Sequence, residues 1–433
     1  MDLKDRLERL HLTSAKASRP REETISDLKR RLERLVDPRR LKRTEKEVIP
    51  ITELVDGEEV VTPYGTVFMR QQVYGSGYRH GEMLLDRVME IPVYPVSLLS
   101  RDENLRDLDF SQTLFLDVET TGLAGGTGTY AFMVGVGYFE QSRFVTRQFF
   151  LRDFSEERAM LWALAEVARR SRFLATFNGK RFDIPLLETR FIISRMECPL
   201  SGLPNYDLLF PSRRIWKGAY DDCRLATLES GVLGIYRDDD VPSEMIPTIY
   251  FDYLSSGNGN EIHRLFYHNR LDVLSLVTLA ARIHELVHRP QTASRSEWFE
   301  SYSLGKLLDR VGRRGEAIER FHEALRFCRD SQEWEILKSL SLAMKREKHM
   351  DEAASIWLEM ISLDRGRELF PYKELAKFYE HQVKDYREAI RWVGEAFERL
   401  EFLSPMEREA LGHRHRRLGS RIERKRIKDK NEG

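Results

Sequence analysis

The spacing of apolar and polar residues changes several times along the chain, and each change marks a new segment. Residues 1–48 contain two near copies of one motif, "DLKDRLERL" and "DLKRRLERL", with leucine at every third or fourth position. This spacing places the leucines on one face and predicts two short amphipathic helices in a charged N-terminal arm. The arm either binds nucleic acid or a partner, or forms a solvated tail, since charge runs are common on solvated faces.

The pattern then becomes that of strands. Within residues 49–104, "GEEVVTPYGTVFMRQQVY" alternates apolar and polar residues around a "PYG" turn, which predicts a hairpin in a β-rich lead-in segment. Within residues 105–292, "TLFLDV" and "FLATF" are typical of short buried strands. Two further strands are predicted at "TYAFMVGVGYF" and "RFVTRQFFL", joined by a polar turn.

Helical patterns alternate with these strands. One helix is predicted at "SEERAMLWALAEVARR", with Ser155 as its N-cap. A second follows at "DIPLLETRFIISRM", and a long last one at "EIHRLFYHNRLDVLSLVTLAARIHELV". The order of strand, hairpin, helix, strand and helix predicts an α/β domain with a mixed sheet.

After residue 298 the pattern is entirely helical. Within residues 298–403, "GEAIERFHEAL", "DEAASIWLEMI" and "REAIRWVGEAF" align without gaps, and Leu304, Leu340 and Ala376 hold equivalent places upstream. A repeat in the mid-thirties with small residues where two helices touch resembles tetratricopeptide (TPR) repeats, with an ordinary helical bundle as the alternative. A TPR array would either dock a partner or substrate on its concave surface or only stabilise the protein.

Composition adds little to this picture. Lys+Arg and Asp+Glu balance at 70 each, so the net charge points to no class of partner, although residues 404–433 form a basic tail that either contacts phosphate backbones or keeps the end in solution. The 3 cysteines are scattered, which suits a reducing compartment. Apolar runs stay below the roughly 18 residues of a membrane span, and the N-terminus lacks a signal peptide's apolar segment, so we expect a cytoplasmic protein without a membrane partner.

The glycine-rich stretch "LDVETTGLAGGTG" at residues 116–128 is the first candidate for chemistry. A phosphate-binding P-loop needs a lysine after its glycines, and a dinucleotide-binding loop needs a helix there. This stretch has no lysine, and a strand pattern follows it. We therefore interpret the glycines as residues that permit tight turns.

The carboxylates of the same stretch offer a different chemistry. Asp117 and Glu119 are two residues apart at a strand end, so both side chains point to one face. Two like charges this close call for a counter-charge such as a divalent cation, but D-x-E is short and common, so the pair taken alone favours solvated strand-end acids. Asp183 follows the next buried strand at a predicted helix start, where it can cap the helix, bind metal or do both.

The long last helix carries a further pair. His268 precedes Asp272 by four residues, which places both on one helix face, while Tyr267 points elsewhere. A single histidine taken alone is more often a polar surface residue. Lys180 and Arg181 could contact phosphate or be solvated, and we interpret Asp207 and the run Asp221–Asp222 as structural or supporting acids.

Three acidic motifs occur in one order, "DVETTGL", "FNGKRFDIPLL" and "HNRLD". Together they resemble the DEDD (DnaQ-like) exonuclease superfamily, which has a ribonuclease H-like fold. The longer stretch "DVETTGLAGGTGTYAF", the later "YDDCRLATLE" and the helical repeats are most similar to bacterial YprB-like proteins. The resemblance implies an α/β domain with a ribonuclease H-like mixed sheet flanked by helices, followed by an all-α, TPR-like helical domain.

The resemblance also implies a chemistry, namely two-metal hydrolysis of phosphodiester bonds in DNA or RNA by a 3′→5′ exonuclease. Its implied ligands for two Mg²⁺ or Mn²⁺ ions are Asp117, Glu119, Asp183 and Asp272. His268 would accept a proton from the attacking water. The implied substrate contacts are Thr120, Thr121, Gly122, Leu123 and Asn178.

One spacing departs from the superfamily. Its histidine-type members usually place four residues between the histidine and the last aspartate, whereas three separate His268 from Asp272, as in tyrosine-type members. Two other functions therefore stay open beside the exonuclease. One is a nucleic-acid-binding scaffold with an inert nuclease fold that recruits partners through its repeats, and the other is a structure-specific endonuclease on the same fold.

Overall fold

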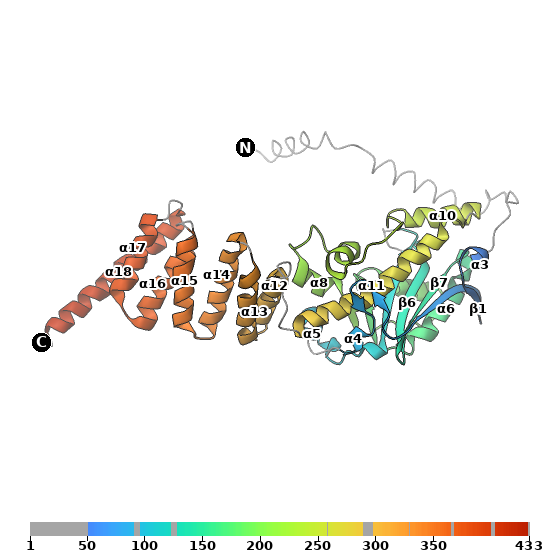
Figure 1. The fold of residues 1–433 in the computed structure, drawn as a ribbon, viewed down its shortest axis with the longest axis horizontal. Helices are drawn as coiled ribbons and strands as arrows, with labels where there is room; N and C mark the ends of the chain where they lie inside the picture. Colours follow the sequence, from blue (N-terminus) through green and yellow to red (C-terminus); the bar gives the residue numbers. More distant parts are fainter. Residues whose placement is uncertain are drawn as a thin grey trace, which may run out of the picture.

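The computed structural model describes residues 51–90, 96–122, 128–257, 259–288, 298–328, 330–364, 368–399 and 403–431. Figure 1 shows an α/β domain at one end of the molecule and a row of helices that extends from it to the C-terminus. The predicted N-terminal arm, residues 1–48, lies outside the described residues.

A mixed sheet forms the centre of the α/β domain, as predicted. In the described part of the chain it has seven strands in the order β1-β2-β7-β6-β5-β8-β9. Strand β5 pairs antiparallel with β6 and parallel with β8. The strands are β1 (Glu58–Thr62), β2 (Gly65–Tyr74), β5 (Thr113–Thr120), β6 (Ala131–Glu140), β7 (Arg143–Phe150), β8 (Phe173–Thr176) and β9 (Asn205–Asp207), and β3 (Arg79–His80) pairs separately with β4 (Met83–Leu84).

The predicted hairpin of the lead-in segment is confirmed as β1 and β2, which pair antiparallel. Strand β2 also pairs along its length with β7. Strands β1 and β2 of the lead-in segment therefore form one edge of the same sheet.

Helices surround the sheet. They are α3 (Ile51–Leu54), α4 (Arg87–Glu90), α5 (Val96–Ser100), α6 (Glu157–Ala168), α7 (Asp183–Ile193), α8 (Leu209–Trp216), α9 (Leu225–Leu228), α10 (Ile246–Ser256) and α11 (Ile262–His288). Short turns of tighter or wider helix are η1 (Glu103–Leu105), η2 (Phe110–Gln112), η3 (Phe154–Glu156) and the π-helical η4 (Glu229–Leu233).

The start of α6 differs from the prediction that Ser155 caps it. Ser155 lies inside η3, and the Asp153 side chain accepts a hydrogen bond of 2.8 Å from its backbone N–H. The chain thus enters α6 through a 3₁₀ turn, and the cap moves two residues upstream.

The alternation of side chains along β5 decides which helix each one meets. Leu114, Leu116 and Val118 pack in one core with residues of α6 and α7, whereas Phe115 packs in a second core with residues of α11. Because strand side chains alternate, Asp117 and Glu119 lie on the same side as Phe115, and α11 crosses that side.

Two glycines on β6 let α11 come close to the sheet. Gly135 pairs with Asp117 of β5. A Cβ atom at Gly135 would lie 2.1 Å from the Asn269 side chain on α11, and one at Gly137 would lie 2.7 Å from Val273. Any larger residue at these two positions would push the helix away from the acids of β5.

The C-terminal region is helical, as predicted. It contains α12 (Trp298–Arg310), α13 (Arg314–Phe327), α14 (Asp330–Arg346), α15 (Met350–Asp364), α16 (Phe370–Phe378), the π-helical η5 (Tyr379–Val383), α17 (Tyr386–Arg399) and α18 (Pro405–Asn431). Each helix contacts the next along the chain. The aligned alanines Ala317, Ala353 and Ala389 lie in every second helix, α13, α15 and α17, and are 0% exposed.

Buried polar contacts join the two parts of the molecule. Trp216 at the end of α8 donates from Nε1 to Glu300 of α12 over 2.7 Å, and Arg282 of α11 bonds the same carboxylate over 3.0 Å. Figure 1 shows α12 beside α8 at this junction. The row of helices is therefore docked on the α/β domain as well as tethered to it. None of the described helices combines the length and apolarity that crossing a bilayer requires.

Candidate functional site

The predicted acids come from three elements of the α/β domain. Asp117 and Glu119 come from the end of β5, Asp183 is the first residue of α7, and Asp272 lies on α11. Three of these acids respond to their neighbours: the Asp272 charge contributes to the raised pKa of Asp117, and the Asp117 charge contributes to the raised pKa values of Glu119 and Asp183. Acids far apart in the sequence thus share one electrostatic environment.

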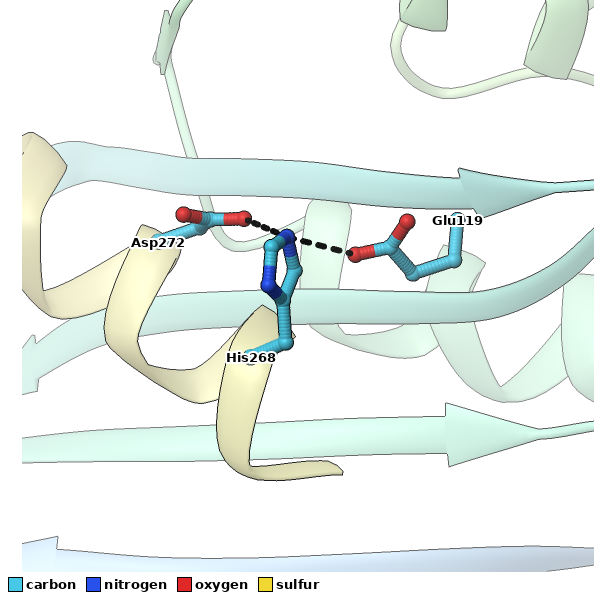
Figure 2. A group of neighbouring side chains, drawn as sticks. All are labelled: Glu119, His268 and Asp272. Atoms are coloured by element: carbon cyan, nitrogen blue, oxygen red, sulfur yellow. Dashed lines mark ion pairs between the residues drawn. The ribbon is translucent and has the colours of Figure 1, made fainter. Parts of the chain in front are cut away.

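His268 lies at the centre of the described cluster. Its Nε2 atom is 3.2 Å from Asp272 Oδ2 and 3.9 Å from Glu119 Oε1. Figure 2 shows the ring pointing between the two carboxylates. The four-residue spacing therefore places His268 and Asp272 on one face, as predicted. One ligand atom from each of these three residues lies within 4.8 Å of the others.

Burial and like charge disfavour ionisation of the carboxylates. Burial, followed by the neighbouring Asp272 charge, raises the pKa of Asp117 to about 7. Burial and then Asp117 raise the pKa of Glu119 well above its usual value, and the same two causes raise that of Asp183. Carboxylate oxygens with a neighbouring imidazole suit a divalent cation, whose charge would relieve this repulsion. The donor set therefore fits a metal site.

Asp183 does not cap α7, although the sequence had left that role open. Helix α7 begins at Asp183 itself, Phe182 occupies the N-cap position, and no side chain caps the helix there. The helix start therefore presents the Asp183 carboxylate to the acid cluster without using it as a cap.

Asp240 holds the other side of the histidine ring, and the sequence patterns did not reveal it. Its Oδ1 is 2.8 Å from His268 Nδ1. Burial opposes charge on the imidazole, but Asp272, the bond to Asp240 and Glu119 together raise the pKa of His268 to about 10. A carboxylate on Nδ1 also fixes the ring orientation, with Nε2 directed at Glu119 and Asp272.

Arg237 is the second residue that the sequence patterns missed. It forms ion pairs with Glu229 over 2.5 Å, with Asp240 over 3.1 Å, and with Asp272. Its side chain is 8% exposed, and burial opposes its charge less than these carboxylates favour it, so the pKa of Arg237 is raised. One buried guanidinium thus serves three carboxylates, and one of them belongs to the predicted metal set.

Asn269 supports Asp117 from the same helix. Its Nδ2 donates to Asp117 Oδ2 over 2.9 Å, and its Oδ1 accepts from Gln148 Nε2 over 3.0 Å. Asn269 is fully buried. The signal for this contact was present in the sequence, since "HNRLD" places the asparagine next to His268 and "GVG" provides the space opposite it.

The lead-in segment contributes to this network as well. His80 Nε2 is 2.9 Å from Ser275 Oγ, and Ser275 donates to Glu229, the partner of Arg237. Burial, with the charge of Arg237, lowers the pKa of His80 to about 4, so this imidazole is neutral near pH 7. His80 of β3 is thereby linked to Arg237 through Ser275 and Glu229.

Other predicted residues have local partners. Asp207 accepts backbone hydrogen bonds from Asn178 over 2.7 Å, from Lys180 over 3.1 Å and from Leu209 over 3.1 Å, so it is structural, as interpreted. The Lys180 ammonium pairs with Asp102 over 2.7 Å, whereas Arg181 is exposed. Asp222 is likewise structural, since it accepts from the Arg224 N–H and the Thr227 hydroxyl.

The predicted substrate loop is only partly described. The Thr120 hydroxyl donates to the Gly122 carbonyl over 3.0 Å, and the Thr121 hydroxyl accepts from the Tyr130 N–H over 3.0 Å. Asn178 holds a left-handed conformation with φ 65°, which asparagine tolerates. Leu123 lies outside the described residues.

Comparisons with known proteins agree with this geometry. A model of the RNase H superfamily matches residues 114–284, a range that begins in β5 and ends in α11 and that contains all four acids and His268. The "Uncharacterized protein YprB" of Bacillus subtilis (strain 168) is 30% identical over 355 residues, which cover 81% of this chain and 85% of that protein. The second match extends well beyond the α/β domain into the helical region.

Proposed function

Because the chain belongs to the family of the Bacillus subtilis YprB protein and carries an RNase H superfamily domain, we propose that it is a 3′→5′ exonuclease of the DEDD type. The observation that carries the proposal is that Glu119, His268 and Asp272 form one cluster of possible ligands, and that Asp117 and Asp183 share its electrostatic environment. The polarity rests on the resemblance of the three acidic motifs alone.

The four carboxylates are proposed to hold Mg²⁺ or Mn²⁺. Bound there, such ions lower the pKa of a water ligand and stabilise the negative charge that develops on the leaving oxygen. Neighbouring side chains of the protein hold these carboxylates in position. Asn269 holds one oxygen of Asp117, and Arg237 binds Oδ1 of Asp272, while Oδ2 of Asp272 lies near His268.

His268 is proposed to accept the proton of the attacking water. Its imidazole stays protonated as long as the carboxylates around it carry uncompensated charge, since they raise its pKa to about 10. Compensating that charge lowers the pKa towards neutrality, where an imidazole is an effective base. Asp240 keeps Nδ1 occupied, so the proton is accepted at Nε2.

The substrate end is proposed to lie along residues 120–123 and beside Asn178. The Thr120 side chain and the Gly122 backbone are only partly buried, so both can reach a terminal nucleotide. The Thr121 hydroxyl is engaged by the Tyr130 N–H, and its side chain is 5% exposed, so its proposed contribution is to shape the loop.

The helical region is proposed to be TPR-like. The aligned alanines in α13, α15 and α17 recur every 36 residues, and each is fully buried where helices touch. Such an array presents a continuous surface for a protein partner.

The experiment is a cleavage assay on end-labelled single- and double-stranded DNA and RNA with Mg²⁺ or Mn²⁺. We expect stepwise shortening from the 3′ end by the wild-type protein. Asp183→Asn should lower the rate by about 10³-fold or more, because losing a ligand removes several kcal/mol of transition-state stabilisation. Asp351→Asn is the matched control, since it changes an exposed aspartate that also lies at a helix start.

The pattern of products separates the alternatives. Internal fragments without stepwise shortening would replace the exonuclease with an endonuclease on the same fold. No cleavage by the wild-type protein, or equal rates for it and Asp183→Asn, would contradict the proposed function. Oligonucleotide binding without calorimetric evidence of metal binding would then favour the scaffold.

A further inference from the structure

A basic groove lies at the far end of the helical region, between the start of α17 and the second half of α18. Its volume is about 660 Å³. The charged and aromatic residues that line it are Lys384, Asp385, Tyr386, Arg387, Lys425 and Arg426. Figure 1 shows α18 running beside α17 towards the C-terminus, at the end of the molecule opposite the α/β domain. The groove is therefore separate from the candidate functional site.

Lys384, at the edge of the groove, has an unusual backbone conformation for a lysine. Lys384 follows the π-helical turn η5 as its C-cap and holds a left-handed conformation with φ 60°. Glycine is the usual residue at such a helix end. A lysine there accepts backbone strain and adds a positive charge at the groove edge.

The groove has an excess of positive charge. Lys384, Arg387, Lys425 and Arg426 are all exposed, and none of the four forms an ion pair with a described carboxylate. The acid among the lining residues, Asp385, is used by the backbone, since Oδ1 accepts from the N–H groups of Arg387 over 3.0 Å and Glu388 over 3.1 Å. Four cations thus face one carboxylate that already caps α17.

The wall beside the groove continues this excess. Glu380 of η5 is a buried carboxylate that accepts from Arg414 over 2.7 Å and from Arg417 over 2.6 Å, and Arg421 lies 3.4 Å away. One acid therefore anchors α18 through three arginines. Two positive charges remain uncompensated at this anchor, next to the four cations of the groove.

An aromatic ring completes the groove. Tyr386 is partly buried, and the Arg421 guanidinium lies 5.6 Å from the centre of its ring. Cations that follow a backbone, combined with an aromatic face on which a base can stack, are the combination that single-stranded nucleic acids bind.

We propose that this groove binds the phosphate backbone of single-stranded nucleic acid and holds the substrate at a second position remote from the candidate functional site. The choice of nucleic acid over another polyanion rests on the proposed nuclease function and on the tyrosine in the groove. The docked junction between α8 and α12 fixes the groove relative to the α/β domain, so a long strand can engage both sites.

The test measures binding without cleavage. A fluorescent oligonucleotide of about 16 nucleotides, the upper end of the site sizes of single-strand modules, is titrated in chelator, as DNA and as RNA. Two variants neutralise opposite walls of the groove, Lys425→Gln with Arg426→Gln on α18 and Lys384→Gln with Arg387→Gln beside η5. The control, Arg326→Gln with Lys348→Gln, removes one arginine and one lysine that are exposed elsewhere on the helical region.

Each groove variant should weaken binding by roughly ten- to thirtyfold near 0.1 M salt and reduce the salt slope by about 1.4, the values for two lost phosphate contacts on a single strand. The control should bind like the wild-type protein. Unchanged binding by both groove variants would overturn the proposal, as would a loss confined to the α18 variant, because that result assigns binding to a basic helix end and not to a groove.

Two further outcomes are informative. If a polyglutamate peptide competes as well as the oligonucleotide and depends on the same residues, the partner is an acidic protein and the nucleic-acid proposal is wrong.

A cleavage assay run in parallel keeps the two proposals apart. Normal cleavage with unchanged binding of the groove variants contradicts the groove alone, and absent cleavage with groove-dependent binding contradicts the nuclease alone.

Discussion

Two π-helical turns of this protein, η4 and η5, share several structural features but lie in regions whose excess charge has opposite sign. Both η4 and η5 carry a buried glutamate, Glu229 and Glu380, whose side chains are 1% and 0% exposed. Each turn is followed by a C-cap residue in the left-handed conformation, Gly234 with φ 64° and Lys384 with φ 60°. Both glutamates bind arginine.

The two regions differ in the ratio of arginines to carboxylates. At η4, one arginine, Arg237, is shared by three carboxylates, so negative charge is left over for a cation. At η5, one carboxylate, Glu380, is shared by three arginines, so positive charge is left over for an anion. A buried ion pair can therefore prepare a site of either sign, depending on which partner is in excess.

The largest expected effect comes from removing the shared cation at η4. Arg237→Gln leaves Glu229 buried without its partner and exposes Asp272 to its like-charged neighbours, so we expect a loss of about 3–5 kcal/mol in the free energy of unfolding. Urea denaturation measures it. Arg391→Gln is the control, because its pair with Glu388 is largely exposed, and such pairs contribute about 1 kcal/mol or less. Similar losses in both variants would contradict the role of Arg237.

Metal binding should distinguish the two regions next. A divalent cation that binds the acids of the folded protein alone stabilises it by about 2.7 kcal/mol at 100 times its dissociation constant. We expect Mn²⁺ to raise the melting temperature of the wild-type protein and of Glu380→Gln equally, and Asp183→Asn to lose most of the shift. A shift that disappears in Glu380→Gln would place the cation elsewhere.

Removing the shared anion at η5 should cost less than removing Arg237. Glu380→Gln takes a charged acceptor from three arginines, which we expect to lower the free energy of unfolding by about 2 kcal/mol. The side chains of Arg414, Arg417 and Arg421 are 20%, 41% and 42% exposed, so they can turn to water, whereas Glu229 cannot. Denaturation of both variants under one condition tests the order, and an equal or larger loss for Glu380→Gln would reverse it.

The smallest effect, measured per pH unit, is a dependence of stability on pH that comes from the acid-rich region. Burial raises the pKa of Asp117 from 3.8 to about 7, so the folded protein binds the proton more tightly than the unfolded chain. The stability from this group is complete below about pH 4 and is lost as the pH rises through 7. His268, with its pKa raised from 6.5 to about 10, adds a loss of the same sign above pH 6.5.

We therefore expect the metal-free protein to lose stability as the pH rises from 6.5 to 8, by about 1 kcal/mol per pH unit for each group that keeps its proton, since one proton per unit corresponds to 1.36 kcal/mol; below pH 6.5 His80, whose pKa is lowered to about 4, opposes the loss. Urea unfolding in chelator measures this slope. Asp117→Asn should flatten the slope above pH 6.5, and saturating Mn²⁺ should flatten it in the wild-type protein. Stability that rises with pH above 6.5 in chelator would show that these carboxylates are ionised freely.

The sequence alone was sufficient for the parts of the site that depend on local geometry. The two-residue spacing placed Asp117 and Glu119 on one face of β5, and the four-residue spacing placed His268 and Asp272 on one face of α11. The 36-residue recurrence likewise placed Ala317, Ala353 and Ala389 at equivalent positions, and all three are buried in helices. Strand and helix periods are properties of the backbone, so any sequence that adopts these elements displays them.

Tertiary structure alone decided the charge of each region. Arg237 and Asp240 lie in an irregular segment without periodicity, and His80 reaches the same network from 195 residues before Ser275. The basic groove similarly depends on α18 folding back on Glu380, 34 residues before Arg414. Which partner is in excess depends on contacts between distant segments, and these exist only after packing brings the segments together and removes water from their charges.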